Sequence, residues 1–253
     1  MNLDMSDYFP IPDLLKTPKI LCIQSHPDDM EIGAGATIAR LVDEGAQISC
    51  LTITDGSIGT TDHNLKPETL VTIRQEEAKK SSEIIGVRES IWLGFPDGGS
   101  LDLKLVRSHI TRTIRLLKPS AVVVNDPWLQ YEAHSDHTIT GLAAAEACLL
   151  ANMPHFYPEH LKENLEPHQV NIVAFYYSAN PNTFIDVSKT WDKKMSALAC
   201  HTSQFPGDML TMIQTYLTQK ARIHGENNNC NLAEAFKVLT PQHLHICENA
   251  WRY

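Results

Sequence analysis

The sequence lacks the features that mark several specialised classes of protein. It has no Lys/Arg cluster, and its 30 acidic residues outnumber 21 basic ones, so the formal net charge is −9. This argues against a nucleic-acid binder and a polybasic membrane anchor, because both need clustered positive charge. No apolar segment reaches the ~18–20 residues that a membrane-spanning helix needs. The opening segment carries acids and prolines but no basic stretch, so we expect no secretory signal.

Cysteine is scarce and scattered. The six cysteines form no C-x-x-C pair, and several lie within apolar segments. A zinc–cysteine site therefore has no support in the sequence. Because disulfides belong to oxidising compartments, we expect buried, reduced thiols and a cytoplasmic location.

Apolar runs alternate with helical segments along the 253 residues. This order indicates βαβ units, and strands that are apolar on both faces indicate a parallel sheet covered on both sides. The sequence therefore predicts an α/β fold, Rossmann-like and three-layered, with a mostly parallel sheet. The strands are expected at 19–24, 47–54, 90–93, 121–125 and 171–178, and the helices at 32–44, 68–85, 104–117, 136–151, about 189–201 and 208–223.

The chain has no internal repeat or low-complexity tract, and its length suits one domain with a sizeable core. We expect a single domain over 1–253, with a core at about 19–205 and a C-terminal helical region at about 206–253. Residues 152–170 hold three prolines and three histidines. Such a stretch predicts a long surface insertion that acts as a lid or as a contact loop.

Polar residues follow four of the predicted strands. Ligands of open α/β sheets bind in the crevice outside the carboxyl ends of the strands. We therefore expect the four loops to converge on one rim and to form the active site there. Their sequences are SHPDD, TDGSIGT, FPDGG and NDPWLQYEAHSDH.

Two histidine–aspartate clusters lie on this rim, at His26 to Asp29 and at His134 to His137. Buried carboxylates are costly to desolvate without partners. Two histidines and one carboxylate with an open coordination position form a common catalytic site for zinc or a similar divalent ion. Adjacent carboxylates in an extended turn point to different sides, so one of Asp28 and Asp29 can bind a metal while the other faces an attacking water.

Further segments occur in a recognisable order: SHPDD, GAGATIARLVDEGAQISCLTITDGSIGT, IRQEEAKKSSEIIGV, LGFPDG and HSDH. This series, over about residues 19–140, resembles the PIG-L/LmbE-like zinc de-N-acetylases, and KKMSALACHTSQF at 193–205 extends the resemblance. NDPWLQYEAHSDH and SANPNTFIDV look most like the diacetylchitobiose-deacetylase branch. Because members remove acetyl from N-acetylglucosamine units, the resemblance implies a small-molecule amino-sugar substrate or its conjugate.

The resemblance also implies a metal centre. The ligands would be His26, Asp29 and His137, with Zn²⁺ or another divalent metal as the cofactor. Asp28 would act as the general base on the attacking water. The family branch, together with the length and the segment at 152–170, further suggests a homo-oligomer, as a trimer or hexamer.

Other roles follow from the same resemblance. His134 would stabilise the tetrahedral oxyanion or act as the acid, and Asp136 would orient or tune His134. Arg74 and Asp97 match positions that hold sugar hydroxyls in relatives. Some members carry a tyrosine two residues before the H-x-D-H histidine, whereas this chain has Glu132 there.

Two of these positions have a plainer interpretation. Arg74 shares an acidic–basic helix face with Glu77, which is typical of a solvated surface. Asp97 lies in a glycine-rich turn, where aspartate is common. The resemblance favours a site role for Arg74 and Asp97 but not for Glu77.

Two other functional classes are less well supported by the residues. Gly33-x-Gly35 resembles the start of a dinucleotide fingerprint and would suit a nucleotide-dependent oxidoreductase. The third glycine is missing, however, and a histidine and acids occupy the pyrophosphate approach. A metal-holding protein without turnover is disfavoured because Asp28, needed only for chemistry, is present. Trp128 and Tyr131 either form an aromatic wall for a sugar ring or pack locally.

Overall fold

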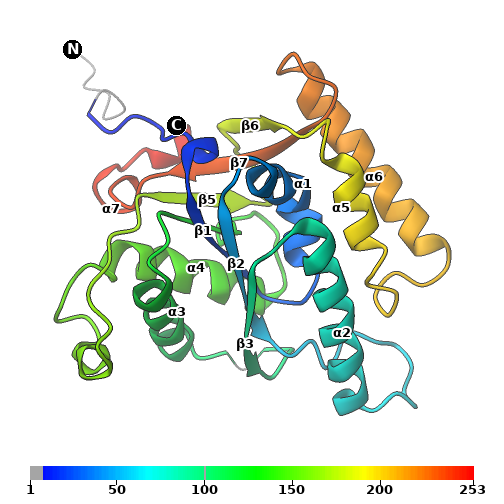
Figure 1. Ribbon diagram of the computed structural model, residues 1–253, viewed down its shortest axis with the longest axis horizontal. Coiled ribbons are helices and arrows are strands. Elements are labelled where there is room, and N and C mark those ends of the chain that lie inside the picture. The colour runs from blue at the N-terminus through cyan, green and yellow to red at the C-terminus, as the bar shows by residue number, and fades with distance from the viewer. Residues whose placement is uncertain (1–7, 100) are drawn as a thin grey trace.

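The computed structural model describes residues 8–99 and 101–253. Residues 1–7 lie outside the described residues. They belong to the opening segment, in which no secretory signal is expected, and to the domain expected over 1–253. A seven-stranded sheet forms the centre of the molecule, in the order β3-β2-β1-β4-β5-β7-β6 (Figure 1). The strands are β1 (Lys19–Gln24), β2 (Gln47–Thr54), β3 (Glu89–Phe95), β4 (Ala121–Asn125), β5 (Ile172–Tyr176), β6 (Thr183–Asp186) and β7 (Ala233–Leu239).

The first five strands pair in parallel, and β7 pairs antiparallel with both β5 and β6. Helices cover both faces, so the predicted three-layer α/β fold is confirmed (Figure 1). The helices are α1 (Asp29–Asp43), α2 (Pro67–Ile85), α3 (Leu103–Leu117), α4 (Ser135–Leu150), α5 (Trp191–Leu198), α6 (Asp208–Glu226) and α7 (His243–Ile246), with short 3-10 helices at Leu14–Lys16, Pro158–Glu163 and Ala250–Arg252.

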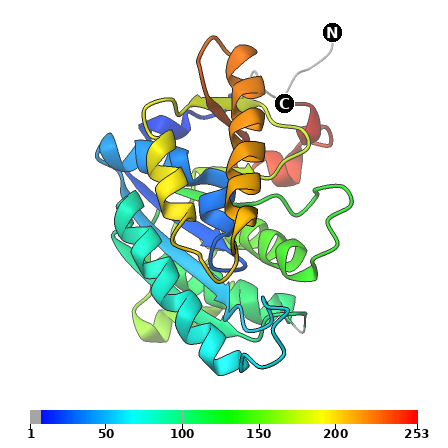
Figure 2. The same cartoon turned by 90° about the vertical axis from the view of Figure 1, so that its right-hand side faces the viewer.

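Two buried apolar clusters lie on opposite faces of the sheet. Strand β1 supplies both, because Ile20 and Cys22 belong to one cluster while Leu21 and Ile23 belong to the other. This is the alternation of side chains expected along a strand that is buried on both faces. One cluster packs under α1 and α5, and α6 runs along the outside next to α5 (Figure 2). The other packs under α3 and α4.

Helix α1 begins at Asp29, three residues before the expected start at 32. Close packing brings this helix onto the sheet. A Cβ atom at Gly33 would lie 2.3 Å from the ring of Tyr176 on β5, so no larger residue fits there without movement. The small residue thus lets the start of α1, and the carboxylates on it, lie tightly over the end of the sheet.

The C-terminal segment differs from the prediction of a helical region at 206–253. It contains α6, but β7 then enters the sheet between β5 and β6. The sequence of β7, AEAFKVL, includes Glu234 and Lys237, and both are buried. Charged residues on a strand suggest an exposed face. Strand β7 is nevertheless buried on both faces, so its sequence does not identify it as a strand of the core.

The surface segment 152–170 is fastened to α3. Arg115, which is buried, donates hydrogen bonds to backbone carbonyls of Ala151, Met153, Phe156 and Tyr157. These bonds satisfy a guanidinium that has no carboxylate partner among the bonds described for it. The suggestion that this segment is a lid or a contact loop stays a prediction.

All six cysteines are free thiols, and four of them are buried. This agrees with the expectation of reduced, mostly buried thiols. Among the described residues, no helix is both long enough and apolar enough to cross a membrane.

Candidate active site

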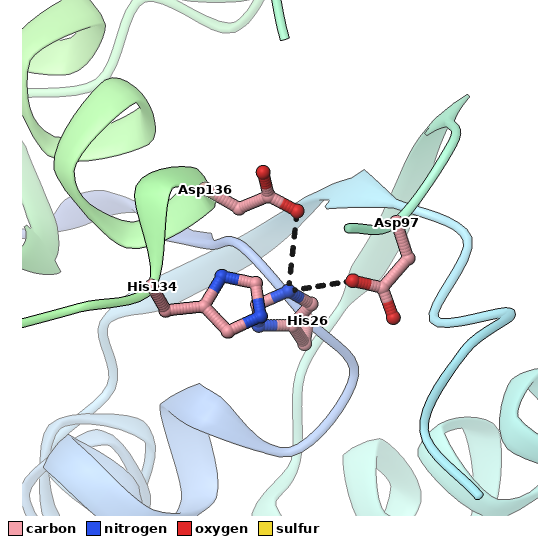
Figure 3. A group of neighbouring side chains, drawn as sticks. All are labelled: His26, Asp97, His134 and Asp136. Carbon is pink, nitrogen blue, oxygen red and sulfur yellow. Dashed lines mark ion pairs between the residues drawn. The ribbon is translucent and has the colours of Figure 1, made fainter. Parts of the chain in front are cut away.

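The loops that follow β1, β3 and β4 meet at one end of the sheet, as the rule for parallel sheets predicts. Figure 3 shows His26 from the loop after β1, Asp97 from the loop after β3, and His134 and Asp136 from the start of α4. The rings of His26 and His134 meet edge to face, with centroids 4.4 Å apart. The structure thus brings together the two histidine–aspartate clusters that the sequence singles out.

Donor atoms of three residues converge here, and Asp29 turns one carboxylate oxygen toward each of the two histidines. His26 Nδ1 lies 3.3 Å from His137 Nε2, Asp29 Oδ1 lies 3.3 Å from His137 Nε2, and Asp29 Oδ2 lies 3.4 Å from His26 Nδ1. A tetrahedral zinc site with bonds of about 2.0–2.2 Å has ligand atoms about 3.3–3.5 Å apart. The geometry and chemistry of this donor set therefore fit a divalent metal with a fourth position open.

A second cluster uses the other nitrogen of His26. His26 Nε2 lies 3.1 Å from Asp97 Oδ1 and 3.5 Å from Asp136 Oδ2, with His134 nearby (Figure 3). Asp136 is fully buried and accepts a hydrogen bond from the backbone N–H of Gly98. The contacts described for the carboxylate of Asp136 are thus to His26 and Gly98, and none of them is a hydrogen bond to His134. The expectation that Asp136 orients His134 stays a prediction.

His26 and His137 are held by acids. Burial lowers the pKa of His26, but the neighbouring carboxylates of Asp29 and Asp97 raise it more, to about 10. Burial likewise lowers the pKa of His137, and Asp29 and Glu132 raise it to about 9. Burial would raise the pKa of Asp29, but these two histidines hold it well below its usual range. Such a concentration of opposed charge is typical of a functional site.

Asp28 stands beside the triad in an unusual backbone conformation. Its φ of 142° lies in a region that side chains other than glycine rarely adopt. It occupies the position before α1, yet its carboxylate makes no capping hydrogen bond. Burial raises the pKa of Asp28, and Asp29 raises it further against the opposing charge of Arg74. A strained, uncapped and buried carboxylate next to a group of residues that could hold a metal is suited to exchanging a proton.

Arg74 is only 3% exposed, so the solvated helix face is wrong for this residue. Its guanidinium donates to the carbonyls of Gly56 and Pro27 and lies 3.5 Å from Asp28 Oδ2. Close approach of the loop requires small residues, because a Cβ atom at Gly56 or Gly59 would lie within 3 Å of the guanidinium. Arg74 therefore ties the loop after β2 to the backbone and side chain beside Asp28.

Glu77 also lies inside the protein, although the charge pattern indicates a solvated position. Its carboxylate accepts hydrogen bonds from the hydroxyls of Thr202 and Ser203 and from the backbone N–H of Ser203. The neighbouring Gln204 donates to the carbonyl of Gly59. Residues 201–204 thus connect α2 to the loop that surrounds Arg74. Thr202 and Ser203 lie about 125 residues after Glu77 in the chain.

Glu132 is another residue of the site to which the sequence gives no role. Its Oε2 lies 3.0 Å from His137 Nδ1, and its Oε1 accepts the backbone N–H of His134 at 2.8 Å. The only signal in the sequence is its place two residues before the H-x-D-H motif, where some members of the family resembled have tyrosine.

Comparisons with known proteins identify the family of the chain. The model of the PIG-L family, described as GlcNAc-PI de-N-acetylase, matches residues 21–148. The diacetylchitobiose deacetylase of Thermococcus kodakarensis is 40% identical over 229 residues, which cover 90% of this chain and 86% of that protein.

Solved structures show the same relation. The N,N'-diacetylchitobiose deacetylase from Pyrococcus horikoshii, complexed with its inhibitor MPG, has a TM-score of 0.88 at 34% identity, over 92% of this chain and 88% of that one. GalB, the 4-carboxy-2-hydroxymuconate hydratase of Pseudomonas putida, shares the fold alone, with a TM-score of 0.71 at 20% identity over 88% and 95% of the two chains. From the family match and the 40% identity to a relative over most of its length, the chain belongs to the PIG-L family of de-N-acetylases.

Proposed function

We propose that this protein is a zinc-dependent hydrolase that removes the acetyl group from an N-acetylglucosamine-type sugar or its conjugate. The observation that carries the proposal is the convergence of donor atoms from His26, Asp29 and His137 at 3.3–3.4 Å, with the separate carboxylate of the adjacent residue Asp28. The similarity to diacetylchitobiose deacetylases supports the substrate class. Family membership and the donor set support a metal cofactor.

The residues divide the chemistry among them. His26, Asp29 and His137 would hold the metal, which polarises the acetamide carbonyl and makes water a better nucleophile when bound. Asp28 takes the proton of the attacking water as general base. His134, a member of the second cluster, faces the developing oxyanion or protonates the leaving amine. The raised pKa of Asp28 supports its role, because a base works best with a pKa near the working pH.

Arg74 and Asp97 act in this proposal through protein contacts as well as through the sugar. Arg74 holds the backbone at Pro27 and the side chain of Asp28, so it orients the base. Asp97 faces His26 Nε2 and so orients a metal ligand. Contacts from either side chain to sugar hydroxyls, which the family resemblance implies, remain part of the proposal.

The test combines a substrate panel with two matched variants. Purified protein is incubated with N-acetylglucosamine, diacetylchitobiose and glucosaminyl conjugates, and free amine and acetate are measured together. Asp28→Asn and Asp29→Asn are then compared for metal content by elemental analysis and for kcat. Because asparagine is nearly isosteric with aspartate but cannot accept the proton, Asp28→Asn should keep metal and lose about 10²–10⁴-fold in rate.

Asp29→Asn should instead weaken metal binding and regain part of its activity in excess metal. A metal-free Asp28→Asn beside a fully loaded Asp29→Asn would show that the two roles are reversed. Full activity of metal-stripped protein, or acetate release from none of the panel, would contradict the proposed function itself. Stoichiometric NAD(H) binding without zinc would favour an oxidoreductase instead.

Assembly and location belong to the same proposal. A homo-oligomer, trimeric or hexameric, is supported by the resemblance alone, and light scattering tests it. A cytoplasmic location is supported by the six free cysteines.

A further inference from the structure

We propose that Glu132 is a positioning residue that selects the nitrogen through which His137 faces the metal, and that the same carboxylate sets the position of His134. This inference rests on the metal-dependent function proposed above. It concerns a residue outside the proposed ligand set, because Glu132 belongs to neither of the two groups of described residues that could hold a metal ion.

The first step is the hydrogen bond to the ring of His137. Glu132 Oε2 lies 3.0 Å from His137 Nδ1, while His137 Nε2, on the far side of the ring, lies 3.3 Å from both His26 Nδ1 and Asp29 Oδ1. A neutral imidazole carries its proton on one nitrogen only. A carboxylate can only accept at Nδ1, so the proton stays there and the lone pair of Nε2 points into the triad.

The second step is the other oxygen of the same carboxylate. Glu132 Oε1 accepts the backbone N–H of His134 at 2.8 Å. His134 is the residue before the first turn of α4, and its own side chain makes no capping bond. The rings of His134 and His137 are stacked, with centroids 5.2 Å apart and planes 26° apart. One carboxylate therefore fixes the chain at one histidine and the ring of the other, and the stack couples the two.

The third step is the comparison with His26. The far nitrogen of this second ligand histidine, Nε2, also faces an acid, at 3.1 Å from Asp97 Oδ1. That contact is an ion pair without an aligned hydrogen bond to any described residue. Of the two contacts, the one between Glu132 and His137 is an aligned hydrogen bond. Carboxylates placed in this way behind ligand histidines typically contribute about 10–100-fold to metal affinity or activity.

The experiment measures metal affinity, not turnover alone. Wild type, Glu132→Gln and Glu132→Ala are stripped of metal, and Kd for Zn²⁺ is measured by competition with a chromogenic chelator. Thermal unfolding of the metal-free proteins is followed in parallel. Glu166→Gln is the matched control, because Glu166 is exposed and the change removes the same negative charge.

The expected result is a Kd for Zn²⁺ raised about 10–100-fold in both Glu132 variants, more in Glu132→Ala, with Glu166→Gln unchanged. The metal-free Glu132→Gln protein should unfold close to the wild-type temperature, since the glutamine oxygen can still accept the N–H of His134. If Glu132→Ala does not fold, Glu132→Gln alone decides.

Three results would overturn the inference or its basis, and they are distinguishable. Glu132 variants that bind Zn²⁺ within about twofold of wild type, against the larger loss expected for such a contact, would remove the positioning role while the proposed function stands. An equal loss in Glu166→Gln would assign the effect to net charge. A wild-type protein that binds no divalent metal would instead remove the proposed function, and with it the basis of the inference.

Discussion

A buried ion pair between α5 and β7 gives a quantitative prediction for stability. Lys194 Nζ lies 2.6 Å from Glu234 Oε1 and also donates to the carbonyl of Ile32, and the two residues are 2% and 5% exposed. Glu234 further accepts the backbone N–H groups of Ala36 and Thr37, which lie in the middle of α1. The pair thus inserts charge beside the backbone of the helix that carries Asp29, a ligand in the proposed metal site.

Glu234→Gln would leave the ammonium of Lys194 buried without its counter-charge. Removing one partner of a buried pair costs about 3–5 kcal/mol of unfolding free energy. One kcal/mol shifts Tm by about 2–4 °C in a chain of this size, so the expected fall is about 6–20 °C. The double variant Glu234→Gln/Lys194→Met removes the stranded charge and should recover part of this loss, because an apolar replacement of a buried pair is often neutral.

Thermal and urea unfolding of the metal-free proteins measure both quantities, and a double-mutant cycle gives the coupling energy. The matched control is the exposed pair of Lys193 and Asp43, 2.5 Å apart. Asp43→Asn should cost at most about 1 kcal/mol, as exposed ion pairs do. A cost below about 1 kcal/mol for Glu234→Gln, or strict additivity in the cycle, would refute the reasoning, since a broken buried pair costs about 3–5 kcal/mol.

Two further predictions concern the site. The metal-free protein holds protons on His137 and His26, whose pKa values are raised to about 9 and about 10, so a metal must displace them. The affinity for Zn²⁺ should therefore rise from about pH 6 to about pH 9, by about tenfold per pH unit for each proton released, and a flat profile in competition titrations would contradict this. Arg74→Lys keeps the charge but loses the fork that holds Gly56 and Pro27, so kcat should fall by about 10–10² with a smaller change in KM. A raised KM at unchanged kcat in steady-state assays would instead assign Arg74 to the sugar.

Much of the fold is visible in the sequence because its signals are local. Strand β4, AVVVN, is a continuous apolar run, and such runs are typical of parallel strands buried on both faces. The order of strands and helices then determines which loops share a rim, so His26 and His137 are expected to meet although 111 residues separate them. The residue types gathered on this rim then indicate the chemistry of the site.

What could not be predicted depends on partners that are distant in the chain. Strand β7 appears as a strand only once Glu234 is seen to face Lys194, 40 residues earlier. The burial of Glu77 depends on Ser203, 126 residues later. The pattern of residues within either segment does not show that these charges are buried. A charged residue in the sequence can be surrounded by water or by a buried partner, and only the distant partner decides which.

The antiparallel strand β7 has a consequence for the order in which the fold assembles. Strands β3, β2, β1, β4 and β5 can pair with one another as soon as residue 176 has left the ribosome. Strand β6 cannot, because its ladder is made with β7 alone, which ends at Leu239. The carboxylate that meets the amides of α1 arrives on the same late strand. The contacts of the helix that bears Asp29 are therefore completed by a strand that follows the five parallel strands in the chain, so a nascent chain contains His26, Asp29 and His137 before Glu234 can reach α1.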